Sequence, residues 1–400
     1  MAIPEAIRKV ERPRNTIVVK RGNGSLMYAV VERVGCKRIG DRNVPVNGYT
    51  VGHIIQGAFV ACSDSVSRRK TELKDYADAV LIDSVSRSLL GELYAVYSAP
   101  DAMKIYVIAL LRVCYPGVPC CRIDHQYETS WASTLLPGIS LGKNTLSPFL
   151  QDLGKSYALI VSFMRKRVDA IAEGHHIAID GTLKEDNSSV NSLSTYSRKS
   201  RVKGTMDITV VFAYNINLRE PVCSKVFRGN VLDCVSYQRF LSENGLTSFE
   251  SDLDSDPLTI YKMYDERWLI EECFRYYKNV TNFDDTKVHS DYSVYGSEFV
   301  NFISSVMTAR LLRRFEETGL FSEMTYNDIM SQLSSAKKVN TNGNGEWEYV
   351  RTTRATEDTL ARLGLLPRPE ETPRKRGRPR KEIDPNAPKR KRGRPRKNPS

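Results

Sequence analysis

Strand-like and helix-like patterns follow one another in blocks along the chain. Residues 15–60 hold β-prone runs separated by Gly-rich turns, which predicts a small N-terminal sheet. Residues 72–173 have apolar side chains at helical spacing, most clearly in 73–97, 100–114 and 145–172. We expect this second block to be mostly helical, and its residues alone give no indication of function.

Strands return in the second half of the chain. Three β-prone runs precede a helical run at 231–243, and they are 176–183 (HIAIDGTL), 207–214 (DITVVFAY) and 222–228 (VCSKVFR). A turn between the last two runs makes them a hairpin. The pattern predicts an α/β fold for this region.

Two further helical runs come after these elements. The first, 259–278 (TIYKMYDERWLIEECFRYYK), has its apolar residues at helical spacing, and the second is 292–315. Arg310, Arg313 and Arg314 lie near the end of the second run and are candidate phosphate contacts. The blocks divide the chain into a β-rich region 1–70, a mostly helical region 71–173, an α/β core 174–320, a helical and loop region with a linker 321–373, and a tail 374–400.

The composition limits the class of protein. Apolar residues make up 41% of the 400 residues, which is ordinary for a soluble globular chain with two or three domains. No apolar run is long enough to cross a bilayer, and the N-terminus lacks the apolar core of a signal peptide. The eight cysteines form no C-x-x-C pair, so we expect reduced core thiols in a cytoplasmic protein without a membrane partner.

The net charge of +12 is concentrated at the C-terminus. Residues 374–400 contain thirteen Lys or Arg and two acidic residues, which gives the tail a charge of +11. Residues 1–373 hold the other 46 of 59 basic and 45 of 47 acidic residues, so the body carries only +1. Such asymmetry is typical of a nucleic-acid-binding tail.

The tail contains one exact repeat, KRGRPRK, at 375–381 and again at 391–397. The cores of the two copies are Arg376, Gly377, Arg378, Pro379 and Arg380, and Arg392, Gly393, Arg394, Pro395 and Arg396. Each core resembles the AT-hook, which lies in the narrow minor groove of A·T-rich DNA. Glycine permits a close backbone approach, proline keeps the strand extended, and the narrow groove attracts arginine. We expect the tail to be disordered when free, and the alternative is a generic polybasic run.

Tyr264, Arg267, Glu271 and Lys278 stand in the predicted helix 259–278 at the spacing Tyr-x2-Arg-x3-Glu-x6-Lys. Steps of three, four and seven place all four side chains on one helical face. This signature resembles that of the bacterial insertion-sequence transposases of the IS-four group. The resemblance implies a ribonuclease-H-like core that cuts and joins DNA at transposon ends, with Tyr264, Arg267 and Lys278 contacting the end.

Asp180 stands within 176–183, after the β-prone Ile177 and Ile179, and is followed by Gly-Thr. It resembles the first catalytic aspartate of the ribonuclease-H-like fold, although an aspartate before glycine is more often a turn residue. The resemblance makes Asp180 and Glu271 two of three acidic ligands for two Mg²⁺ ions, which activate the nucleophile and stabilise the leaving oxygen. The basic loop 196–203 (YSRKSRVK) is either a phosphate contact or a solvated loop.

The sequence departs from the family pattern between its two carboxylates. Asp180 and Glu271 are 91 residues apart, with no β-prone run ending in Asp and no room for the β-rich insertion of the family. We infer an internal deletion near 245–257 that removed the fourth strand, the second catalytic Asp and the insertion. The acidic residues at 252–256 fit solvated carboxylates or helix caps. Without a fourth strand, the edge of the strand at 177–180 is unpaired unless another segment covers it.

Three functions therefore stay open. The first is a transposase, the second a catalytically inactive transposase-derived protein that holds transposon ends, and the third an architectural binder of A·T-rich DNA. In each case the partner is double-stranded DNA and the protein is associated with the nucleoid. The expected protein partner is a second copy of the chain or a full-length transposase. Strand cleavage separates the first function from the others, and preference for a terminal repeat separates the second from the third.

Overall fold

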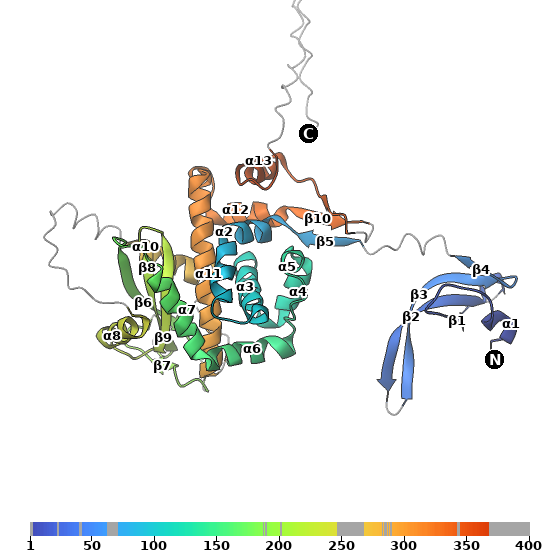
Figure 1. Cartoon of the computed structure of the whole chain (residues 1–400), viewed down its shortest axis with the longest axis horizontal. Helices are drawn as coiled ribbons and strands as arrows, with labels where there is room; N and C mark the ends of the chain where they lie inside the picture. Colours follow the sequence, from blue (N-terminus) through green and yellow to red (C-terminus); the bar gives the residue numbers. More distant parts are fainter. Residues whose placement is uncertain are drawn as a thin grey trace, which may run out of the picture.

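The computed structural model describes residues 3–21, 24–39, 42–61, 71–186, 188, 190–200, 202–245, 268–281, 283, 286, 288, 290–341 and 345–367. These residues have a mixed α/β architecture with three antiparallel sheets (Figure 1).

The N-terminal sheet has the strand order β1-β2-β3-β4. Its elements, after the short helix α1 (Glu5–Arg8), are β1 (Thr16–Lys20), β2 (Tyr28–Ile39), β3 (Arg42–Ile55) and β4 (Ala58–Ala61). Val30 and Val31 of β2 and Ile54 of β3 are buried and provide a small core. A sheet was expected for 15–60, because the β-prone runs there alternate with glycine-containing turns.

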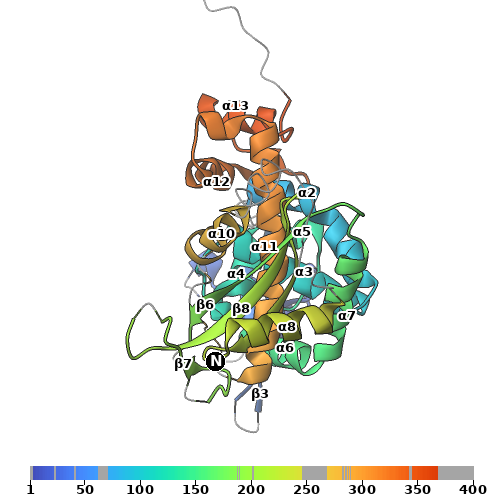
Figure 2. The same cartoon turned by 90° about the vertical axis from the view of Figure 1, so that its left-hand side faces the viewer.

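A helical core surrounds the long helix α11 (Asp291–Glu317), drawn in orange in Figure 1 and Figure 2. The helices between residues 77 and 169 are α2 (Ala77–Tyr94), α3 (Ala99–Cys114), α4 (Ile123–Thr129), α5 (Ala132–Leu135), α6 (Lys143–Lys155) and α7 (Tyr157–Asp169). Helices α2, α3 and α6 pack directly on α11. Seventeen residues of α11 are buried, so this helix is the centre of the core rather than a surface helix.

Two glycines let α6 and α11 cross with their backbones in contact. A Cβ atom at Gly154 would lie 1.8 Å from the carbonyl oxygen of Tyr292, and one at Gly296 would lie 1.9 Å from that of Leu150. Neither neighbour is a flexible side chain that could move aside. The crossing therefore requires glycine at both positions.

The central sheet follows α7. Its strands are β6 (Ile177–Glu185), β7 (Thr195–Tyr196), β8 (Met206–Asn215) and β9 (Glu220–Arg228), and α8 (Asp233–Asn244) comes next. Strand β8 pairs with β6 along one edge and with β9 and the short β7 along the other. The predicted hairpin at 207–228 is the β8–β9 pair, and the predicted helix at 231–243 is α8.

The remaining elements follow α8 in the chain, except for one short strand at residues 72–75. After α10 (Trp268–Arg275) and a π-helical turn (Tyr276–Val280), the chain continues into α11, α12 (Tyr326–Ser335) and α13 (Arg354–Arg362). A third sheet has the order β11-β10-β5, with β5 (Glu72–Asp75), β10 (Lys337–Asn340) and β11 (Glu348–Tyr349). In Figure 1 this sheet lies on the opposite side of the helical core from the central sheet.

Three expectations for the body were wrong. The helical run 73–97 begins as strand β5, because 72–75 pairs with β10. The run 145–172 is two helices that meet at Ser156. Cys36 and Cys121 are exposed free thiols rather than core thiols.

Candidate functional site

Asp180 lies in the middle of β6, not at its end, because the pairing of β6 with β8 continues unbroken through Gly181 to Glu185. Its Oδ1 accepts a hydrogen bond from the Gly181 amide at 2.8 Å and another from the Tyr237 hydroxyl of α8 at 2.9 Å. The turn interpretation of Asp180 is therefore wrong. The carboxylate is half-buried and oriented by two donors.

A cleft of about 730 Å³ opens beside Asp180. It is lined by residues 180–183 of β6, by Tyr237, by Tyr196 of β7 and by 197–199 of the loop that follows. The side chains of Arg198 and Lys199 are exposed in this loop. The predicted basic loop and the predicted aspartate therefore face the same cleft, which favours negatively charged ligands at its rim and cations near the carboxylate.

Hydrogen bonds hold the basic loop in place. Ser200 donates to the carbonyl of Ser197 at 2.9 Å and also to the buried carboxylate of Asp207. A Cβ atom at Gly229 would lie 2.2 Å from the carbonyl oxygen of Asp207, so only glycine lets the end of β9 pass this close to β8. The loop base is thus fixed by the sheet while the basic side chains reach solvent.

Helix α10, which carries Glu271, packs on the sheet face that Phe212 occupies. Asp180 and Phe212 are direct partners in the β6–β8 register, and such partners project from one face. The Phe212 ring contacts Phe274 of α10, with their centroids 5.7 Å apart. Glu271 precedes Phe274 by three residues, so the two are neighbours on the helix surface, and the Glu271 side chain is exposed.

Lys278 belongs to the π-helical turn that follows α10, and its side chain is half-buried. A π-helical turn winds wider than an α-helix. The expectation that a continuous α-helix places Glu271 and Lys278 on one face is therefore wrong for the last turn.

A buried ionic network connects β6, α11 and the π-helical turn. Lys184 Nζ lies 2.6 Å from Glu298 Oε1, and the two side chains are 2% and 4% exposed. The Tyr277 hydroxyl donates to the other oxygen of Glu298. Because Asp180 and Lys184 share β6 while Glu271 and Tyr277 share the α10 segment, the network fixes the strand relative to the helix.

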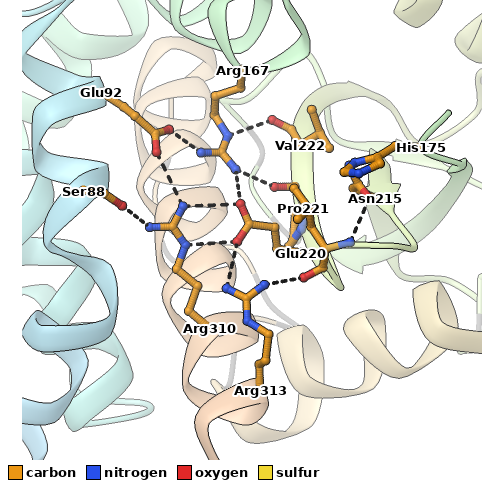
Figure 3. A network of polar contacts seen from close by, with 11 residues as sticks. Ser88, Glu92, Arg167, His175, Asn215, Glu220, Pro221, Val222, Arg310 and Arg313 are labelled. Carbon is orange, nitrogen blue, oxygen red and sulfur yellow. Dashed lines mark hydrogen bonds and ion pairs between the residues drawn. The ribbon is translucent and has the colours of Figure 1, made fainter. Parts of the chain in front are cut away.

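A second network surrounds Glu220 at the start of β9 (Figure 3). Arg310 of α11 lies 3.0 Å from Glu220 Oε2, and Arg167 of α7 lies 3.0 Å from Glu220 Oε1. Burial raises the pKa of Glu220. The hydrogen bonds and charges of Arg310 and then of Arg167 lower the pKa by more than burial raises it, so the pKa is below its usual value. Both arginines also approach Glu92 of α2.

This second network corrects the expectation for Arg310, one of the three arginines of 292–315. The Arg310 side chain is 11% exposed and forms ion pairs with Glu220 and Glu92, so it is not a phosphate contact. Arg313 donates to the Leu218 carbonyl at 2.6 Å, and Arg314 lies 3.6 Å from Glu317. These side chains connect the β8–β9 hairpin to α11 and complete the last turns of the helix.

Several predicted residues lie outside the described part of the chain. They are Tyr264, Arg267, the acidic residues at 252–256, and both repeat cores of the tail from Arg376 to Arg396. The stretch 246–267, which includes the inferred deletion, is also outside it.

The described residues contain no group of three or more His, Cys, Asp or Glu that could hold a metal ion. Asp180 and Glu271 supply carboxylates on two elements that pack together, β6 and α10. Mg²⁺ is commonly held by one or two carboxylates, with waters and substrate phosphates as its other ligands. In number, two carboxylates suit one Mg²⁺ ion and not two. None of the described helices is long and apolar enough to cross a membrane.

Comparison with family models, with curated proteins and with solved structures gives no match. The assignment of a function therefore depends on the residues and on the geometry.

Sequence reasoning missed the residues that hold the site together. Tyr237 carries no motif, and its hydrogen bond to Asp180 arises because α8 packs on β8 and β9 next to β6. Lys184 and Glu298 gave a weak signal, because each is a charge within a largely apolar element. Their pairing across 114 residues requires the fold.

Proposed function

We propose that the chain is a transposase-type DNA-binding protein whose central sheet and α10 perform Mg²⁺-dependent phosphoryl transfer at transposon ends. The observation that carries the proposal is that Asp180 lies beside a basic cleft in β6, while Glu271 stands on α10, which packs on β6. The Tyr-Arg-Glu-Lys spacing and the two AT-hook-like repeats of the tail are independent support from the sequence.

The strand order agrees with the start of a ribonuclease-H-like core. In the family the first three strands form an antiparallel set, and a fourth strand lies next to the first. Here β6, β8 and β9 form such a set, and α8 follows. Within the described residues the pairing ends at β6, α10 packs beside it, and the Thr286 amide donates to the Glu185 carbonyl near its end.

The residues of the cleft have distinct roles in this proposal. Asp180 and Glu271 would hold one Mg²⁺, which supplies a Lewis acid for a phosphate oxygen. Tyr237 fixes the Asp180 carboxylate through its hydroxyl. Arg198 and Lys199 would neutralise backbone phosphates at the rim, where their exposed side chains are accessible to a duplex.

One observation favours a second function, DNA binding without catalysis. The family uses three carboxylates, whereas the described part of the central sheet and α10 offers two at this site, and no third acidic group joins them. A protein that holds transposon ends through its tail and cleft would need no third ligand.

Cleavage of a plasmid that carries the DNA flanking the gene of this chain tests the proposal. We expect Mg²⁺- or Mn²⁺-dependent nicking by the wild type, and its loss in Glu271→Gln and Asp180→Asn. Glu272→Gln is the matched control, because Glu272 is the next residue of α10 and forms an ion pair with Arg275. Nicking that survives in both site variants would exclude these carboxylates. Intact binding without nicking by the wild type would favour the second function.

A further inference from the structure

Two lysines face each other on the third sheet. Lys74 of β5 and Lys338 of β10 are direct partners in the antiparallel register. Like charges directly opposite on neighbouring strands destabilise a sheet. The next pair along the ladder has the usual arrangement, since Lys337 pairs with Asp75 and forms an ion pair with its carboxylate.

Aromatic rings surround the two ammonium groups. Lys338 Nζ lies 4.0 Å from the centroid of the Tyr76 ring and 4.8 Å from that of Trp131. Lys74 Nζ lies 5.3 Å from the centroid of Trp347, which itself contacts Trp131 edge to face. The rings hold both charges at one place and remove part of their water.

Hydroxyl groups complete the cluster. Lys74 Nζ donates to Ser133 Oγ at 2.8 Å and to Thr134 Oγ1 at 3.1 Å. Among the described residues, no carboxylate forms an ion pair with either Lys74 or Lys338. Burial lowers the pKa of both lysines, and for Lys74 the charge of Glu72 opposes this effect.

We propose that Lys74 and Lys338, together with the hydroxyl of Thr134, bind a phosphate group of the DNA backbone. An oxyanion between the two ammonium groups would relieve their repulsion, and the cluster offers it several donors, although the charge of Glu72 also acts on Lys74. The choice of DNA as the source of the phosphate rests on the proposed function. The site lies on the other side of the helical core from the Asp180 cleft (Figure 1), so it is a separate contact.

Salt dependence of duplex binding by the full chain tests the DNA part of the proposal. The affinity for a labelled 30-base-pair duplex is measured by fluorescence anisotropy at several salt concentrations, for wild type and for Lys74→Gln/Lys338→Gln. Each phosphate contact contributes roughly 0.9 to the slope of log affinity against log salt. Because the proposed site holds one phosphate, we expect the double variant to lower the slope by about 1.

The control is Lys104→Gln/Lys143→Gln, which makes the same change in net charge. Lys104 also lies over a ring, 4.6 Å from the centroid of Phe149, and Lys143 is exposed. The slope of the control should equal that of the wild type. An unchanged slope in the Lys74/Lys338 variant would overturn the assignment to DNA, whether or not the protein cleaves its ends. A lowered slope without any cleavage would support the site and count only against the catalytic proposal.

Thermal unfolding identifies the anion without DNA. Sodium phosphate stabilises folded proteins in general, so the informative quantity is the increase in melting temperature over sodium chloride at equal ionic strength, which should be larger for the wild type than for the double variant. A larger increase in the wild type together with an unchanged DNA slope would mean a site for free phosphate and would overturn the DNA assignment. Equal increases and no change in slope would show that the lysines only pack on the rings. Should the double variant not fold, Lys338→Gln alone is compared, with an expected loss of about 1 in slope.

Discussion

Replacing Lys184 by methionine removes the charge that faces Glu298 inside the domain. Methionine keeps most of the length of the lysine side chain, so the change acts mainly on the charge. Both partners are at most 4% exposed, and the Glu298 carboxylate would stay buried after the substitution. Removing one partner of a buried pair costs about 3–5 kcal/mol of unfolding free energy.

The structure places the expected cost near the lower end of this range. Tyr277 and Asn301 continue to donate to Glu298 in the variant, the latter at 3.1 Å. We therefore expect about 3 kcal/mol for Lys184→Met, and a similar cost for Glu298→Gln, which leaves the lysine unpaired. The double variant should cost at least about 2 kcal/mol less than the sum of the two, because no buried charge remains.

Urea-induced unfolding followed by tryptophan fluorescence measures these costs. The difference in midpoint multiplied by the slope gives each change in free energy. Lys143→Met is the control, since Lys143 is exposed and should change the stability by less than about 0.5 kcal/mol. A cost below about 1 kcal/mol for Lys184→Met, or strict additivity in the double variant, would refute the claim that this pair connects β6 to α11.

Four other predictions concern separate parts of the chain. Deleting 374–400 should remove most of the roughly 10³- to 10⁵-fold loss of DNA affinity expected between 50 and 200 mM salt; an unchanged salt slope would contradict the role of the tail. Glu220→Gln should cost about 3–5 kcal/mol near neutral pH. Because the pKa of Glu220 is lowered in the folded state, its ionised carboxylate contributes stability above about pH 4.3, and this contribution is lost as pH falls through the folded pKa. The stabilities of wild type and variant should therefore converge in acid, which urea midpoints measured against pH would show. Gly296→Ala should lower the unfolding free energy by the upper end of about 1–3 kcal/mol, whereas Gly91→Ala, which has open space at its Cβ position, should not. Equal melting temperatures for the two variants would contradict the contact of α6 with α11. Tyr237→Phe should weaken Mn²⁺ binding without unfolding the protein, and unchanged affinity in calorimetry would exclude its positioning role.

The sequence predicted the elements whose pattern is local. The hairpin at 207–228 was predictable because apolar alternation is broken by a turn, and α11 because its apolar residues recur over many turns. Strand β5 was not predictable, because its four residues become a strand only by pairing with β10, more than 260 residues later. The two halves of 145–172 could not be separated, since both are helical and only the packing of α6 on α11 sets the break.

The residues of the candidate site were likewise only partly predictable from the sequence. Asp180 and Glu271 were found through a resemblance in spacing, and the basic loop through its composition. The hydroxyl of Tyr237 and the Lys184–Glu298 pair depend on contacts between distant segments, which one sequence does not reveal. Arg310 was misinterpreted because an arginine near the end of a helix has the same pattern whether it faces solvent or a buried carboxylate.

Titration with Mn²⁺ as a substitute for Mg²⁺ tests most directly whether Asp180 and Glu271 share an ion. Isothermal calorimetry on the full chain needs no knowledge of the DNA ends and compares wild type, Asp180→Asn, Glu271→Gln, the double variant and Glu272→Gln. We predict one Mn²⁺ per chain at this site, lost equally in both single variants, with no further loss in the double variant and none in Glu272→Gln. Equal Mn²⁺ affinity in wild type and in both single variants would contradict a shared site.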